Sequence, residues 1–176
     1  ILTDSGVVGA RISWMTENQV NHKMIERLHD FGWAMHYLIP MAELDREWED
    51  MIFHSPGNFV IEHNGVPPVE KGAESEEFNF VLRCLDTDRC WVKLSPRFSA
   101  QEDFPFDDTD SFVHKLVELA PHRLLWGSDW PHPQYFKPMP NDVSLLDMML
   151  DWVPDEKTRE MIFVTNPENL FGFTSP

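Results

Sequence analysis

Apolar residues gather into short runs that recur along the chain and are separated by stretches with helical spacing. Five runs have the length and the β-branched or aromatic content of buried strands, and they cover 7–14, 33–39, 59–63, 90–95 and 124–129. Between the runs, apolar residues return every three or four positions, as at Phe78, Val81 and Leu85, which is typical of an amphipathic helix. The pattern predicts alternating strands and helices, and therefore βαβ units with a parallel sheet.

Two architectures fit this alternation. An open, doubly wound sheet would be complete with five strands, so the pattern by itself favours it. A (β/α)8 TIM barrel needs eight strands and about 250 residues, of which a chain of 176 residues supplies only a part. The chain begins at Ile1, without Met, and runs almost directly into an apolar strand. As a barrel, residues 1–176 would be the C-terminal part of one domain, with about three strand–helix units before them.

Composition narrows the class of protein. Hydrophobic residues make up 42% and charged residues 25% of the chain, as in globular proteins, and no apolar run approaches the ~20 residues of a membrane span. The net charge of −16 argues against a nucleic-acid partner, because phosphate contacts need clustered Lys and Arg. Cys84 and Cys90 could form a disulfide, but two reduced, half-buried thiols are favoured, which indicates the cytoplasm. We expect a small-molecule substrate and no membrane partner, and a homo-oligomer is compatible with the sequence.

Polar and titratable side chains gather where the predicted strands end. They are Arg11 and Ser13, His36 and Tyr37, His63, Lys93 and Ser95 with Arg97, and Asp129. The carboxyl ends of parallel strands meet at one edge of the sheet, where the active sites of α/β proteins form. A charged residue at the end of a buried strand costs desolvation energy unless it is paired or used. The pattern therefore indicates a functional site at this edge.

The most specific segment is 124–133, which reads LLWGSDWPHP. Its carboxylate, Asp129, could act as a general base toward water or as a metal ligand. The alternative is a strand-end turn in which Asp129 only accepts hydrogen bonds from nearby amides. His63, in the run VIEHNG, is the second candidate, although a lone histidine at a strand end is more often structural than catalytic.

These segments resemble the amidohydrolase-related lactonases, which belong to the amidohydrolase 2 family of TIM barrels. The resemblance rests on LLWGSDWPHP, on IEHNG, on CWVKLS followed by Arg97, on GARISW near the start and on NPENLFGF near the end. The matches run in order through nearly the whole chain. The resemblance therefore implies a (β/α)8 TIM barrel, of which this chain supplies about strands four to eight, rather than an open sheet.

The resemblance also implies roles for individual residues. Asp129 would activate the hydrolytic water, and His63 would polarise the attacked carbonyl or share a metal ion with Asp129. Arg11 and Arg97 would bind substrate carboxylates, a task that suits the planar guanidinium. The cofactor would be zinc, another divalent metal, or none. Further residues expected to contact substrate are Tyr37, Trp130 and His132.

Three departures from the family pattern bear on the substrate. The His-x-His pair of the family's first strand is not in this sequence, so the chain by itself is not expected to complete an active site. Glu17 and Val66 stand where the family has arginines that bind anions. We therefore expect a hydrolase for a lactone or similar cyclic ester of a small carboxylic or sugar acid. The alternatives are a zinc-dependent decarboxylase of an aromatic or unsaturated acid and a non-catalytic, truncated relative that acts as a binding module.

Overall fold

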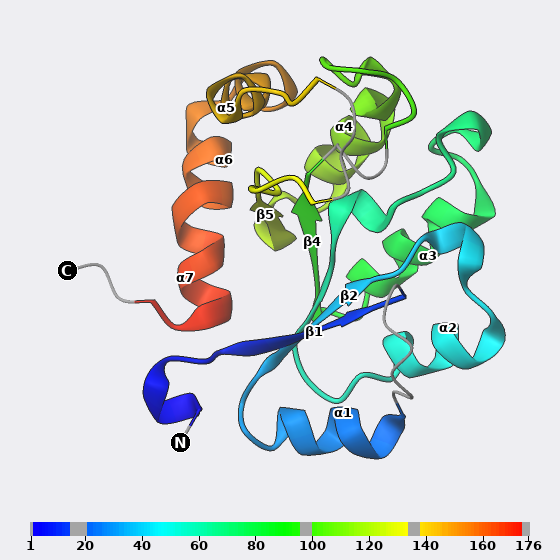
Figure 1. The fold of residues 1–176 in the computed structure, drawn as a ribbon, viewed down its shortest axis with the longest axis vertical. Helices are drawn as coiled ribbons and strands as arrows, with labels where there is room; N and C mark the ends of the chain where they lie inside the picture. Colours follow the sequence, from blue (N-terminus) through cyan, green and yellow to red (C-terminus); the bar gives the residue numbers. More distant parts are fainter. Residues whose placement is uncertain (1, 15–20, 96–99, 134–137, 174–176) are drawn as a thin grey trace.

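The computed structural model describes residues 2–14, 21–95, 100–133 and 138–173, in which strands and helices alternate (Figure 1). The strands are β1 (Gly9–Ser13), β2 (Ala34–Leu38), β3 (Phe59–Ile61), β4 (Cys90–Leu94) and β5 (Leu124–Trp126). The helices are α1 (His22–His29), α2 (Arg46–Phe53), α3 (Glu76–Leu85), α4 (Asp110–Leu119), α5 (Asp142–Trp152), α6 (Glu156–Glu160) and α7 (Asn166–Phe171). Each strand lies inside one of the five predicted ranges, so the predicted alternation is confirmed.

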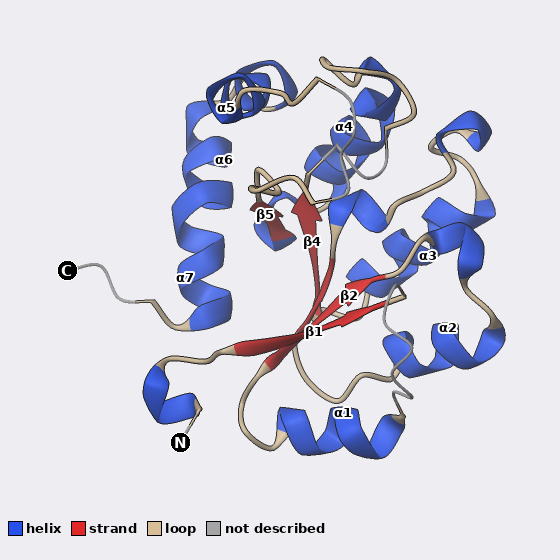
Figure 2. Ribbon diagram, viewed as in Figure 1, coloured by secondary structure: helices blue, strands red, loops and turns tan. Residues whose placement is uncertain are grey.

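The five strands form one parallel sheet whose order, β1-β2-β3-β4-β5, follows the chain (Figure 2). A doubly wound sheet reverses its strand order at a switch point, and no reversal occurs among the strands that the structure describes. This sequential order is that of neighbouring strands in a barrel. The α/β class and the parallel sheet are confirmed, whereas the assignment to strands four to eight stays a prediction.

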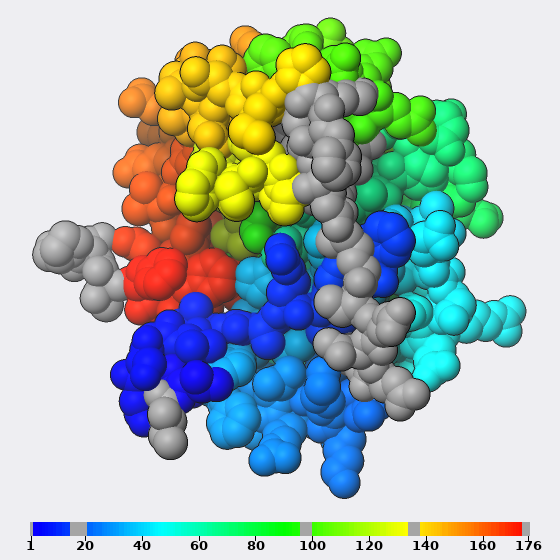
Figure 3. All heavy atoms as spheres, in the orientation of Figure 1, coloured from blue at the N-terminus to red at the C-terminus, as the bar shows by residue number. Residues whose placement is uncertain are grey.

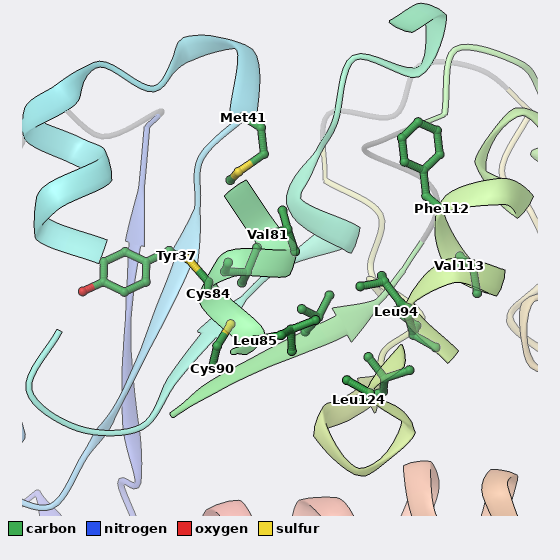
Figure 4. Packing of buried hydrophobic residues seen from close by; sticks show 14 of the residues in the cluster. Tyr37, Met41, Val81, Cys84, Leu85, Cys90, Leu94, Phe112, Val113 and Leu124 are labelled. Carbon is green, nitrogen blue, oxygen red and sulfur yellow. The ribbon is translucent and has the colours of Figure 1, made fainter. Parts of the chain in front are cut away.

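One side of the sheet, which we call the helix face, carries the main hydrophobic core. The strand register places Tyr37, Ile61, Val92 and Leu124 in one row across the sheet, and all four side chains are buried in a single cluster. Figure 4 shows part of this cluster, with Tyr37 and Leu124 among the labelled residues. Burying one such aliphatic side chain contributes roughly 1.5–3 kcal/mol. The helix face therefore holds the sheet in place, and its residues are not available to a ligand.

The opposite side of the sheet carries charged side chains. Because successive side chains of a strand point to opposite faces, Arg11, His36, Glu62 and Lys93 point away from the helix face, and we call these four residues the polar face. In the space-filling view, the green region around β4 lies recessed between blue β1, the red C-terminal helix and the yellow segment after β5 (Figure 3). A small apolar cluster adjoins the polar face and consists of Val60, Trp91, Leu125, Leu170 and Phe171.

Two observations concern the predicted thiols and the expected absence of a membrane-spanning helix. Cys84 and Cys90 are free thiols, as favoured from the sequence, and both are fully buried rather than half-buried. Burial raises the pKa of Cys84 to about 12, so this thiol stays protonated at neutral pH. In the described part of the chain, no helix combines the length and the apolar character needed to cross a membrane.

The turn after β3 depends on a glycine, which gives a stability prediction. Gly65 has a φ of +86°, and a Cβ atom there would lie 2.6 Å from Cγ2 of Val81. Gly6 has a similar φ of +87° in the left-handed region but no atom within 4 Å of such a Cβ. We expect Gly6→Ala to cost about 1 kcal/mol for its backbone conformation alone and Gly65→Ala to cost about 3 kcal/mol, because it adds a clash in the core. Urea denaturation of the intact protein measures both, and equal losses would contradict this account.

Candidate active site

The structure brings the two predicted catalytic residues together at the carboxyl edge of the sheet. His63 follows β3 and Asp129 follows β5, and Nε2 of His63 lies 3.5 Å from Oδ1 of Asp129. The side chains are 3% and 9% exposed, respectively. A carboxylate and an imidazole at this separation, at the mouth of parallel strands, can act together on one ligand.

The loops that hold this pair have an unusual backbone. His63, Asn64 and Val66 in the loop after β3, and Asp129 in the loop after β5, have φ values of 52°, 57°, 42° and 68°. Non-glycine residues in this region cost on the order of 1–3 kcal/mol each and cluster at functional sites. The amide of Ser95, which follows β4, donates a 3.2 Å hydrogen bond to Oδ1 of Asn64. The loop is therefore tied to the neighbouring strand in its left-handed conformation.

His63 is neutral at physiological pH. Burial lowers its pKa to about 4, although the negative charges of Asp129 and Glu62 act in the opposite direction. A neutral imidazole can donate or accept a hydrogen bond, depending on its tautomer. His63 can therefore polarise or orient a bound group, but it does not bring a full positive charge to it.

Glu62 is the centre of the polar face and connects it to the catalytic pair. Its Oε1 accepts a 2.9 Å hydrogen bond from Nδ1 of His36 and a 2.8 Å hydrogen bond from Nζ of Lys93. Its Oε2 lies 3.7 Å from the Arg11 guanidinium and 3.9 Å from Nε2 of His63. One carboxylate, 4% exposed, thus lies among four nitrogen-bearing side chains.

The cationic neighbours keep Glu62 ionised. Burial by itself would raise the pKa of Glu62, but the hydrogen bond from His36 and the charge and hydrogen bond of Lys93 lower it well below the usual range. A buried carboxylate is tolerated when it is paired and hydrogen-bonded in this way. Glu62 can therefore hold Lys93 and His36 at fixed positions next to His63.

Of the two predicted anion-binding arginines, Arg11 lies on the polar face and its side chain is 56% exposed. It can reach a ligand above the sheet while it stays near Glu62. Arg97 lies outside the described residues, so its role stays a prediction.

The three other predicted substrate contacts have different positions. Tyr37 belongs to the helix face, where its hydroxyl lies 3.1 Å from Oγ of Ser55 and burial raises its pKa to about 12. His36, the residue before it, lies on the polar face instead, and a substrate contact by Tyr37 stays a prediction. Trp130 follows Asp129 and is 75% exposed. His132 is 3% exposed, and its Nε2 lies 3.3 Å from Oδ1 of Asp142, at the start of α5.

The described side chains do not make up the expected metal site. A catalytic zinc ion generally takes three protein ligands. His63 and Asp129 supply two, and the nearest third group, Glu62, is engaged by Lys93 and His36. Within the described ranges, no group of three His, Cys, Asp or Glu residues could hold a metal ion. The described residues of this chain do not by themselves fit a metal ion, so no catalytic step is derived through one, and the metal requirement stays a prediction.

Glu62 was not among the predicted site residues, and His36 and Lys93 were predicted at strand ends but not chosen for the site. Strand alternation could have identified them. Side chains alternate along a strand, so Val60 and Glu62 lie on one face of the sheet and Phe59 and Ile61 on the other. The same alternation puts His36 and Tyr37 on opposite faces. A charged residue on the face of a buried strand needs partners, so Glu62 and Lys93 on neighbouring strands were a detectable pair.

The comparisons with known proteins agree with this geometry. The sequence profile of the Amidohydrolase family matches residues 4–173. The chain is 34% identical to a 4-sulfomuconolactone hydrolase of Rhizobium radiobacter over 97% of the chain and 60% of that protein. It is 30% identical to a 2-pyrone-4,6-dicarboxylate hydrolase of Comamonas testosteroni over 97% of the chain and 61% of that protein.

A solved structure supports the same relationship. An apo crystal structure from Agrobacterium tumefaciens superposes with a TM-score of 0.84 at 28% identity, covering 99% of this chain and 65% of that one. The fold is that of an α/β protein whose polar residues lie at the carboxyl edge of a parallel sheet. The chain belongs to the amidohydrolase family. It spans about 60% of the length of the curated relatives that it matches.

Proposed function

We propose that the protein containing this chain hydrolyses a lactone or similar cyclic ester of a small carboxylic or sugar acid. The observation that carries the proposal is the Asp129–His63 pair, 3.5 Å apart and nearly buried beside the polar face. The similarity to hydrolases named for a muconolactone and for a pyrone, which is itself a cyclic ester, supports this reaction type. In this proposal, the chain supplies strands four to eight of a barrel in the cytoplasm.

The residues suggest the following reaction. Asp129 takes a proton from water, and the resulting hydroxide oxygen bonds to the lactone carbonyl carbon while the C=O electron pair moves to oxygen. When the carbonyl re-forms, the ring C–O bond breaks and the departing oxygen takes the proton back from Asp129. His63, neutral and buried, orients the carboxylate and the water. The product is an open-chain hydroxy acid, and Asp129 is ionised again.

Arg11 suggests that the substrate carries an acidic group, which gives a test of substrate class. We expect Arg11→Gln to raise KM at least 10-fold for a lactone with a carboxylate substituent, because a charged hydrogen bond contributes about 1.5–3 kcal/mol, and to leave a neutral lactone nearly unaffected. Arg27→Gln, which removes an exposed arginine of α1, is the matched control. Initial rates from a pH-indicator assay give both constants. A uniform loss on both lactones would argue against carboxylate binding by Arg11.

A lactone panel tests the proposed function itself. The intact protein is incubated with five- and six-membered lactones, with and without carboxylate groups, and ring opening is followed by acid release. Aromatic and unsaturated acids are assayed in parallel for loss of carbon dioxide. Ring opening of at least one lactone is the expected result. Carbon dioxide release without ring opening would replace the proposal with the decarboxylase hypothesis, and no turnover of either kind would leave the binding-module hypothesis.

A further inference from the structure

Four side chains surround Glu62, and among them only Arg11 is more exposed than Lys93. It leaves β4 on the polar face, and its side chain is 25% exposed, whereas that of Glu62 is 4% exposed. The 2.8 Å hydrogen bond to Glu62 fixes the position of the ammonium group. The end of this flexible side chain is thus held in place by a carboxylate that is itself buried.

Gly127, in the LLWGSDWPHP segment, makes room for this arrangement. A Cβ atom at Gly127 would lie 3.0 Å from Cδ and 3.9 Å from Cε of Lys93. Contacts of 3.0 Å are tighter than ordinary packing, so any side chain at this position would push the lysine away. The stem of Lys93 therefore passes directly over the backbone that leads, two residues later, to Asp129.

The ammonium group retains hydrogen-bonding capacity. It has three N–H donors, and one of them is used by Glu62. The described parts of the chain offer Lys93 no second hydrogen-bond partner, and its side chain is partly open to solvent. His63, which the family resemblance offered as the group that polarises the carbonyl, is neutral. The reaction proposed above places a full negative charge on the carbonyl oxygen. A fixed cation close to His63 and Asp129 would stabilise that charge.

We propose that Lys93 donates a hydrogen bond from its ammonium group to the carbonyl oxygen of the bound lactone, and that Glu62 is the positioning residue that holds Lys93 there. The inference rests on the proposed lactone hydrolysis and adds the group that stabilises its oxyanion. As hydroxide attacks, the electron pair of the C=O bond moves to oxygen, and the ammonium offsets this charge without giving up a proton. When the ring C–O bond breaks, the pair returns and the carbonyl is restored.

The test separates a charge that acts on substrate from a charge that only neutralises Glu62. In the intact protein, Lys93→Met is expected to lower kcat by about 10²–10³-fold, with a smaller change in KM. The double variant Lys93→Met/Glu62→Gln removes both charges, so it contains no unpaired buried carboxylate. We expect it to regain thermal stability but not kcat. Lys115→Met is the control outside the candidate site: it removes a lysine that binds Glu74 at 2.8 Å and the Ala73 carbonyl at 3.0 Å, and it should keep the wild-type rate.

Chemical modification provides an independent readout. Lys93→Cys is alkylated with 2-bromoethylamine, which forms a thioether, releases bromide and restores an ammonium at nearly the original reach. Cys84 and Cys90 are buried and should not react in the folded protein. We expect alkylation to restore at least 10-fold in kcat to Lys93→Cys and to leave Lys93→Met unchanged.

The outcomes distinguish this inference from the proposed function. If Asp129→Asn abolishes turnover while Lys93→Met keeps the wild-type kcat, the role of Lys93 is overturned and lactone hydrolysis stands. Recovery of kcat in the double variant also overturns it, because Lys93 would then serve only to neutralise Glu62. If the wild-type protein opens no lactone, both proposals fail together.

Discussion

Asp129→Asn is expected to lower kcat for lactone hydrolysis by about 10³-fold, because asparagine has the shape of aspartate but cannot accept the proton of the attacking water. Asparagine is also one of the few residues that adopt a positive φ readily, so the backbone at φ 68° should be preserved. KM should change little if the carboxylate acts mainly in the transition state. Steady-state kinetics on the lactone that the wild-type protein opens fastest give both values.

The control for this prediction is Asp147→Asn, which makes the same change at an exposed position of α5. It should retain the wild-type kcat. If Asp129→Asn kept more than a tenth of the wild-type kcat while circular dichroism showed an intact fold, Asp129 would not be the general base. The alternative given in the sequence analysis, a strand-end turn in which Asp129 only accepts hydrogen bonds from nearby amides, would then be the better explanation.

The second large effect concerns stability. Glu62 and Glu74 each bind a lysine at 2.8 Å, but the Glu62 side chain is 4% exposed and that of Glu74 is 87% exposed. Glu62→Gln leaves Lys93 and His36 without their anion in a largely buried setting, and we expect it to cost about 3 kcal/mol in the free energy of unfolding. Glu74→Gln breaks a surface pair and should cost less than about 1 kcal/mol. Equal losses in chemical denaturation would contradict the assigned role of Glu62.

The stabilisation by Glu62 should depend on pH in a defined direction. Its pKa is lower in the folded than in the unfolded protein, so the unfolded state binds the proton first as the pH falls. The contribution is therefore complete above the unfolded pKa, near 4.5, and decreases as the pH falls below it. The difference in unfolding free energy between wild type and Glu62→Gln should accordingly be largest at neutral pH and shrink toward pH 3. A difference that grows on acidification would contradict the assignment.

Much of the fold could be predicted because strand and helix periodicity are local properties. The runs around Phe59 and Cys90 are short, apolar and regularly spaced, and their parallel pairing follows from the intervening helices. Local periodicity cannot decide between an open sheet and a part of a barrel. That choice depends on strand order, which the structure gives as sequential, while the alternation alone fits both.

The candidate site was predicted in part for the same reason. Asp129 and His63 stand at the ends of strands, so their meeting follows from parallel topology. The network around Glu62 depends on which face each side chain occupies and on distances across three strands, which a list of strand-end residues does not contain. Tyr37 and His36 illustrate this point, because neighbouring strand residues face opposite sides and, of these two, only His36 lies on the polar face.

The left-handed backbone of the two site loops affects how mutagenesis at this site should be interpreted. Alanine at Asn64, Asp129 or His132 would remove a functional group, and it would also place a residue with a Cβ but no local hydrogen bonds at a φ above 50°. Activity lost in an alanine scan would therefore combine chemistry with loop displacement. Isosteric replacements, or glycine as a reference state for the backbone, separate the two contributions.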